Sequence, residues 1–376
     1  MQLDEIAGQR AARMRPNLCH RCLFRILGML CVMSSLLVGC TVVGPAAMRA
    51  GRLAYNEAII ETDKEQMLLV VVRNRYEERS QLLAVGSVTA NVSVVARSGI
   101  ELGFGNDQDF AANLVPFGAG VVYEENPTIS YTPVGGEQYV RALTSPVPLA
   151  GLAQLASSVI NPSLVYNALI ASVNGIYNPS FTFSPVEPDP RFGRFVTIMT
   201  KLTRAHRLQW VQDTEHARLV IDHYSPTYAV EVSELLRLLG LPGPRDPTGR
   251  MVLPVSLALD GPNTGGMAIV TRSVANLLQI LSGAVQIPEE DLAAGVAVRY
   301  PSPGPVGGGL RVHRAEAKPT HASVAVKYRN AWFYIDERDQ LTKQFARLVG
   351  TLLSIAIEES TERSSATPLL TLPLSR

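Results

Sequence analysis

Cysteine is nearly absent from the sequence, and the four that occur all lie within its first forty residues. They are Cys19, Cys22, Cys31 and Cys40. The pair Cys19 and Cys22 has the spacing of half a zinc or redox motif, but no second pair follows it. A disulfide framework is therefore not expected in the body of the chain, which must be stabilised by its core.

The sequence from Cys40 onward also has no excess of basic over acidic residues. From Cys40 onward the sequence holds 29 lysines and arginines against 31 acidic side chains, so this part of the chain is close to neutral. Nucleic-acid binding requires a concentrated basic face. Nucleic acid is therefore not an expected partner, while a hydrophobic content of 47% is enough for a sizeable core.

The apolar run at Ile26–Val38 has about thirteen residues, whereas a membrane-spanning helix needs roughly 20. It follows a segment with Arg21 and Arg25, an arrangement typical of a secretory signal peptide. The run ends in Leu37-Val38-Gly39-Cys40, which resembles the lipobox of bacterial lipoproteins. A signal peptide with a chance cysteine near its cleavage site is the alternative.

The resemblance implies cleavage between Gly39 and Cys40 and a lipid on the Cys40 sulfur, with no other cofactor expected. Several acyl chains on one residue make membrane attachment close to permanent. Because Thr41 is not aspartate, the resemblance implies an outer-membrane lipoprotein that faces the periplasm, with the inner membrane or the cell surface as alternatives. Translation could begin at Met1 or at Met14.

These features predict four regions. They are a cleaved signal peptide (1–39), a lipidated tether (40–50), an α+β globular body (51–358, with two possible lobes at 51–208 and 209–358) and a flexible tail (359–376).

Hydrophobic periodicity predicts mixed helices and short antiparallel strands in the body. Helices are expected at 48–76, with a break near Thr62 and a solvated end at Arg73 and Arg75, and at 137–144, 149–159, 162–172, 191–208, 228–240 and 272–283. Strands are expected at 88–94, 100–104, 128–134, 217–224 and 251–259.

The last part of the body predicts a β-hairpin followed by an amphipathic helix. Strands at 322–328 and 331–336 flank the turn Arg329-Asn330, and Asp336 precedes the helix. A stripe with steps of four and three residues follows at Leu341, Phe345, Leu348, Leu352 and Ile355. Such a stripe packs on the protein's own sheet or forms a contact with a partner.

Residues with catalytic potential are few. Asp222 and His223 are neighbours on a predicted strand, and because their side chains should point to opposite faces, we expect no catalytic pair. No Gly-x-Ser-x-Gly elbow supplies a nucleophile, and no histidine spacing matches a metal site. The sequence therefore favours a protein that is not an enzyme.

Three segments resemble parts of bacterial envelope lipoproteins to which no function is assigned: "LLVVVRNRYEE", "PTISYTPVGGEQYV" and "AWFYIDERDQLTKQFARLVGTL". Together with the lipobox, they lead us to expect a lipoprotein that scaffolds or binds another envelope protein, or forms a homo-oligomer. The expected contacts are the stripe above and the apolar tail residues Leu369, Leu370, Leu372 and Leu374. The alternative is a periplasmic hydrolase or small-molecule-binding lipoprotein whose site contains Arg204, Asp222 and His223.

Overall fold

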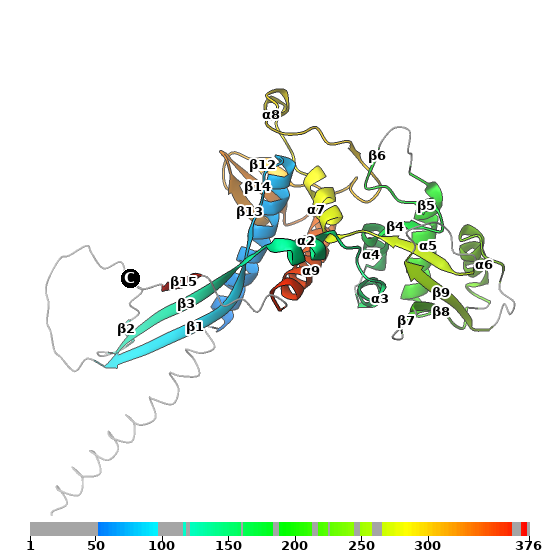
Figure 1. Ribbon diagram of the computed structural model, residues 1–376, viewed down its shortest axis with the longest axis horizontal. Helices are drawn as coiled ribbons and strands as arrows, with labels where there is room; N and C mark the ends of the chain where they lie inside the picture. Colours follow the sequence, from blue (N-terminus) through cyan, green and yellow to red (C-terminus); the bar gives the residue numbers. More distant parts are fainter. Residues whose placement is uncertain are drawn as a thin grey trace, which may run out of the picture. The chain divides into compact units, whose positions relative to one another are not determined.

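The computed structural model (Figure 1) describes residues 52–96, 116–117, 121–158, 161–182, 188–212, 217–224, 226–243, 249–257, 265–362 and 370–373. The chain divides into two compact units, Met1–Ile59 and Ile60–Arg376. Only residues 52–59 of the first unit are described. The expected signal peptide (1–39) and Cys40 therefore lie outside the described residues, as does the strand expected at 100–104.

The described part of the chain is an α+β fold, as the sequence predicts. Its first helix runs without interruption over residues 52–75, so the expected break near Thr62 is wrong. The other helices are α2 (Gly136–Thr144), α3 (Leu149–Ser158), α4 (Pro162–Leu169), α5 (Pro190–Arg204), α6 (Ala229–Leu238), α7 (Val274–Gly283), α8 (Glu289–Ala293) and α9 (Gln340–Glu362).

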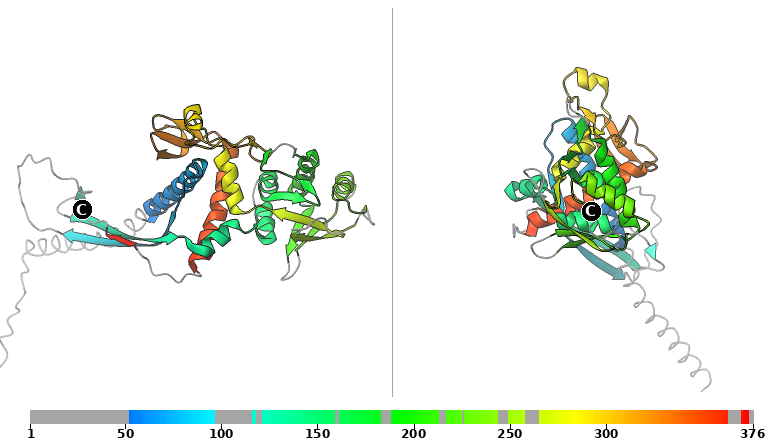
Figure 2. Two further views of the ribbon diagram at one scale, coloured as in Figure 1. Left: turned by 45° about the horizontal axis from the view of Figure 1, so that its top comes forward. Right: turned by 90° about the vertical axis from the view of Figure 1, so that its right-hand side faces the viewer.

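A long antiparallel ribbon is formed by β1 (Leu82–Ala96) and β3 (Val121–Val134), which run side by side in both views of Figure 2. The pairing runs from Leu82 opposite Val134 to Ala96 opposite Val121, with one bulge at Gly86. Two short strands pair with β3: β2 (Pro116–Phe117) and β15 (Leu370–Pro373). The segment expected to be a flexible tail thus contributes a strand to this sheet.

The largest sheet has six strands in the order β5-β4-β10-β9-β8-β7. Their bounds are β4 (Ile170–Val173), β5 (Ile176–Tyr177), β7 (Leu208–Gln212), β8 (Ala217–Ile221), β9 (Met251–Leu257) and β10 (Met267–Thr271). All pairs are antiparallel except β9 with β10. Because β10 pairs with β4, residue 208 does not separate two lobes: one sheet contains strands from both sides of it.

Arg272 holds the end of α4 and the β4–β5 region together from inside the fold. Its side chain is 3% exposed. It donates hydrogen bonds to the carbonyl oxygens of Asn167, Ala168, Ile170 and Asn178 and to the hydroxyl of Ser180. Burial lowers the pKa of Arg272 to about 10. Five acceptors thus compensate a buried cation that has no carboxylate partner among the described residues.

The predicted C-terminal hairpin and helix are confirmed. Strands β13 (Ala322–Tyr328) and β14 (Ala331–Asp336) pair through a two-residue turn in which Arg329 has a φ of 51°. The strand β12 (His313–Ala315) completes a three-stranded sheet. Two further short strands, β6 (Phe181–Thr182) and β11 (Ser302–Pro303), pair with each other.

Candidate functional site

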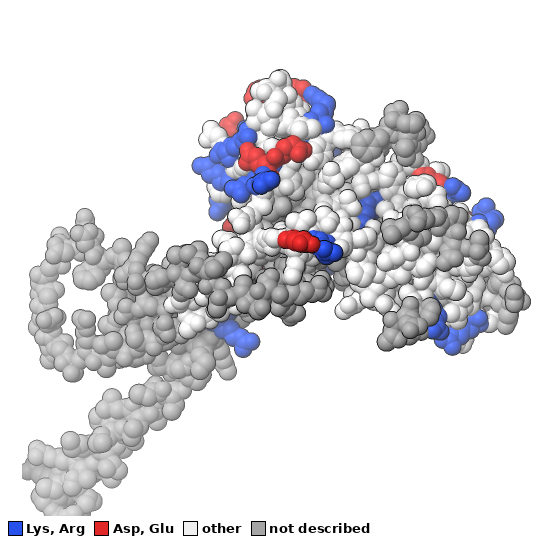
Figure 3. Space-filling view, viewed as in Figure 1, with Lys and Arg blue, Asp and Glu red and all other residues white. Residues whose placement is uncertain are grey.

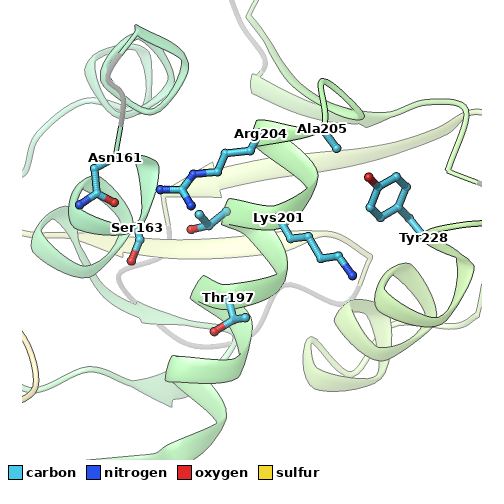
Figure 4. A pocket seen from close by; sticks show the side chains of 8 residues that line it. Asn161, Ser163, Thr197, Lys201, Arg204, Ala205 and Tyr228 are labelled. Atoms are coloured by element: carbon cyan, nitrogen blue, oxygen red, sulfur yellow. The ribbon is translucent and has the colours of Figure 1, made fainter.

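An open groove of about 690 Å³ lies on α5, beside the start of α4 and the residue that precedes α6 (Figure 4). Its lining is mostly polar and contains no acidic residue. The lining residues are Asn161, Ser163, Thr197, Thr200, Lys201, Arg204, Ala205 and Tyr228. A groove of this size can hold a small metabolite.

The local sequence explains how α5 presents this polar face. Pro190 occupies the first helical position, and the carboxylate of Asp189 caps the helix by accepting from the Arg191 N–H at 2.9 Å. One side of α5 is apolar and buried in the core, and it includes Phe195 and Met199. The α5 residues that line the groove recur with steps of three and four along the chain, and all of them except the buried Thr200 lie away from this side.

Two ion pairs join α5 to α6. Lys201 bonds to Glu231, and its ammonium lies 5.5 Å from the centre of the Tyr228 ring. Arg194 binds Glu234 through two hydrogen bonds, of 2.8 and 2.5 Å. The bond from Lys201 lowers the pKa of Glu231. The charge of Lys201 is thus largely compensated within the fold.

Arg204 differs from these residues. It is exposed, it ends α5, and no hydrogen bond or ion pair connects it to a described residue. Figure 4 shows its side chain reaching across the groove toward Ser163 and Asn161 at the start of α4. Asn161 does not cap α4 with its side chain and instead donates to Gln344 Oε1 at 3.3 Å. Arg204 was predicted from the sequence as a site residue, but Asn161 and Ser163 were not, because only tertiary packing brings the start of α4 next to α5.

Asp222 and His223 do interact, so the expectation that their side chains point apart is wrong. The strand β8 ends at Ile221, and His223 adopts a φ of 48°, which turns its side chain back. His223 Nδ1 lies 3.1 Å from Asp222 Oδ1. However, 78% of the His223 side chain is exposed. Neither residue lines the groove of Arg204, so the three residues do not form one site.

The stripe on α9 is mostly internal. Phe345, Leu348 and Leu352 are buried in the core, whereas Leu341 and Ile355 at its two ends are 42% and 47% exposed. Packing on the protein's own body therefore accounts for the three central residues. Only the two end residues are available to a partner in this conformation.

Two of the four tail residues that were expected to contact a partner lie in the described part of the chain. Leu370 and Leu372 belong to β15, in register with Tyr131 and Ile129 of β3. Leu369 and Leu374 lie outside the described residues, as do Gly39 and Cys40.

Arg75 was expected at a solvated helix end, and this expectation is wrong. Its side chain is buried, donates to the carbonyl oxygen of Val298, and has its guanidinium carbon 4.3 Å from the centre of the Tyr300 ring. Burial lowers the pKa of Arg75. This arginine ties the first helix to the segment after α8 and has a structural role.

Basic and acidic side chains lie next to each other over the β12–β14–β13 sheet on the face shown in Figure 3. Within the described ranges, no group of histidine, cysteine and acidic residues could hold a metal ion. In that part of the chain, no helix is both long and apolar enough to span a membrane.

Comparisons with protein-family models, curated proteins and solved structures gave no match.

Proposed function

We propose that the chain is a lipid-anchored lipoprotein of the bacterial envelope, attached to the outer membrane through Cys40 and facing the periplasm. The support is the sequence Leu37-Val38-Gly39-Cys40 at the end of a short apolar run. In this proposal residues 1–39 are removed. The folded body then binds another envelope protein or a second copy of itself, without catalysing a reaction.

The observation that carries the binding role is the outer edge of β1. This strand has 15 residues and contains no charged residue and no proline. It lies at one end of the strand order β1-β3-β15, so its other edge has no partner strand among the described residues. Natural proteins usually protect long edge strands with charges or prolines. An edge without them is suited to pairing with a strand from another chain.

The register identifies which backbone groups face outward. The Leu83 N–H donates to Gln66 Oε1 and the Leu83 C=O accepts from Gln66 Nε2, so these two groups point away from β3. In an antiparallel pair this orientation recurs at every second position. Leu83 is opposite Pro133. Steps of two residues along β3 lead from Pro133 to Tyr131 and then to Ile129. Because Ile129 is opposite Val88, the outward orientation recurs at Val88. The Val88 N–H is therefore available to an added strand.

A proline at position 88 tests this role. Val88→Pro removes the outward N–H without removing a bond to β3. We expect the variant to lose its oligomeric partner, or the envelope protein that co-purifies with wild type, while its circular dichroism stays unchanged. Thr89→Ser, at the adjacent position, is the control and should retain the partner. Retention of every partner by a folded Val88→Pro variant would contradict binding through this edge.

The groove of Arg204 favours a second candidate function, the binding of a small molecule. An exposed arginine without an ionic partner among the described residues, together with hydroxyl groups from two helices, is a suitable arrangement for recognising an anionic group. The two functions are compatible, because the groove and β1 involve different residues. Calorimetry with the purified full chain and small anions tests this second function.

A further inference from the structure

Thr200 has a hydroxyl without a hydrogen-bond partner among the described residues. Its side chain lines the groove on α5, and the residue is only 8% exposed. The other two threonines of α5 behave differently. Thr197 donates to Gly193 O and Thr203 to Met199 O, both at 2.8 Å. A buried hydroxyl without a partner is costly, and its place in the groove points to a ligand that would complete it.

One positive charge in the groove, that of Arg204, has no acidic partner among the described residues. Lys201 is bonded to Glu231, but Arg204 has no such partner among the described residues, and the groove lining contains no carboxylate. The start of α4 lies opposite, with Ser163 in the lining. A helix start attracts anions through its dipole and its free N–H groups. At α4 the Ser163 N–H is the donor available, because Pro162 has no N–H and the Leu164 N–H donates to Asn161 O at 3.1 Å. Arg204, Thr200 and the start of α4 thus all favour a negative group in the space between them.

We propose that the groove binds a small molecule through a phosphate group held by Arg204, Thr200 and Ser163. This assignment rests on the second candidate function given above. A phosphate has three strong acceptor oxygens, one for each of these three side chains, whereas a carboxylate has two. Tyr228 and Lys201, farther along the groove, contact the remainder of the ligand.

Titration calorimetry of the full chain with inorganic phosphate and with glycerol 3-phosphate tests the proposal. Both should bind, and Arg204→Gln should weaken binding at least about tenfold, as loss of a charged hydrogen bond does. Arg237→Gln, an exposed change on α6, is the matched control and should leave binding unchanged.

Thr200→Val separates binding from folding. Because the hydroxyl has no partner among the described residues, the variant should keep or raise the melting temperature yet weaken phosphate binding severalfold. Thr351→Val, on the exposed side of α9, should leave phosphate binding unaltered. A Thr200→Val protein that is stable and binds phosphate as wild type does would overturn the role of this hydroxyl.

The remaining outcomes separate the phosphate assignment from ligand binding in general. Absence of phosphate binding, or equal binding by a folded Arg204→Gln protein, overturns the proposal. Acetate that binds as tightly as phosphate also overturns it, although the groove would remain a small-molecule site. Tighter binding of glycerol 3-phosphate than of phosphatidic acid in phosphatidylcholine vesicles supports a soluble phosphate ester. The reverse order supports a phosphate on a lipid headgroup.

Discussion

The side-chain amide of Gln66 binds the backbone of Leu83 at both of its hydrogen-bonding groups. Gln66 Oε1 accepts from Leu83 N at 3.0 Å, and Gln66 Nε2 donates to Leu83 O at 3.3 Å. A side chain of the first helix thus occupies, at the beginning of β1, the place that a neighbouring strand would take. The rest of the β1 edge has no such cover among the described residues.

Removal of this amide should expose the Leu83 N–H. We expect Gln66→Ala to increase hydrogen exchange at the Leu83 amide roughly fivefold, because a hydrogen bond of this kind contributes about 1 kcal/mol. Hydrogen exchange measured by NMR checks this. Gln66→Glu is the matched control, because it retains an acceptor for the Leu83 N–H and should retain most of the protection. Equal exchange in all three proteins would show that the contact does not protect β1.

Substitution of Arg272 should destabilise the fold. We expect Arg272→Lys to lower the free energy of unfolding by about 3 kcal/mol, because an ammonium has only three donors and leaves buried acceptors unpaired. Urea denaturation measures this difference. The exposed change Arg237→Lys on α6 should stay within about 0.5 kcal/mol of wild type. A similarly small effect of Arg272→Lys would mean that its hydrogen bonds contribute little.

The α5–α6 ion pairs predict sensitivity to acid. The pKa values of Glu231 and Glu234 are lowered from 4.5, chiefly by hydrogen bonds from Lys201 and Arg194. A carboxylate whose pKa is lowered by folding stabilises the protein above its unfolded pKa. That stabilisation is lost as the pH falls below about 4.5 and through the folded pKa.

Urea midpoints measured between pH 7 and pH 3 check this. We expect the double variant Glu231→Gln and Glu234→Gln to show a shallower loss of stability with falling pH than wild type. High salt should flatten the wild-type profile in the same direction, because both pairs are partly exposed. Identical profiles for variant and wild type would refute a role for these two carboxylates.

Much of the fold could be predicted from local patterns. The hairpin around Arg329, the helix after it and the helices α5 and α7 follow from periodicity and from prolines at their joints. The strand β4 was missed because Ile170–Val173 continues an apolar run from α4, and such a run fits either structure. Pairing of β10 with β4 joins residues about 100 positions apart, which no local pattern can show.

The candidate site was only partly accessible to sequence reasoning. Arg204 could be named because it is a charged residue near a helix end. Thr200 and Ser163 could not, because their significance depends on the packing of α4 against α5 and on a missing hydrogen bond. The pair Asp222 and His223 was misjudged because a positive φ at His223 cannot be read from strand alternation.

Membrane fractionation of the Cys40→Ala variant tests the central claim most directly. We expect the wild-type protein to remain with the membranes after a high-salt wash and to be released by detergent. The Cys40→Ala protein should instead appear in the soluble fraction, because the substitution removes the sulfur that would carry the lipid. A Cys40→Ala protein that stayed with the membranes through the same wash would contradict lipid anchoring at this residue.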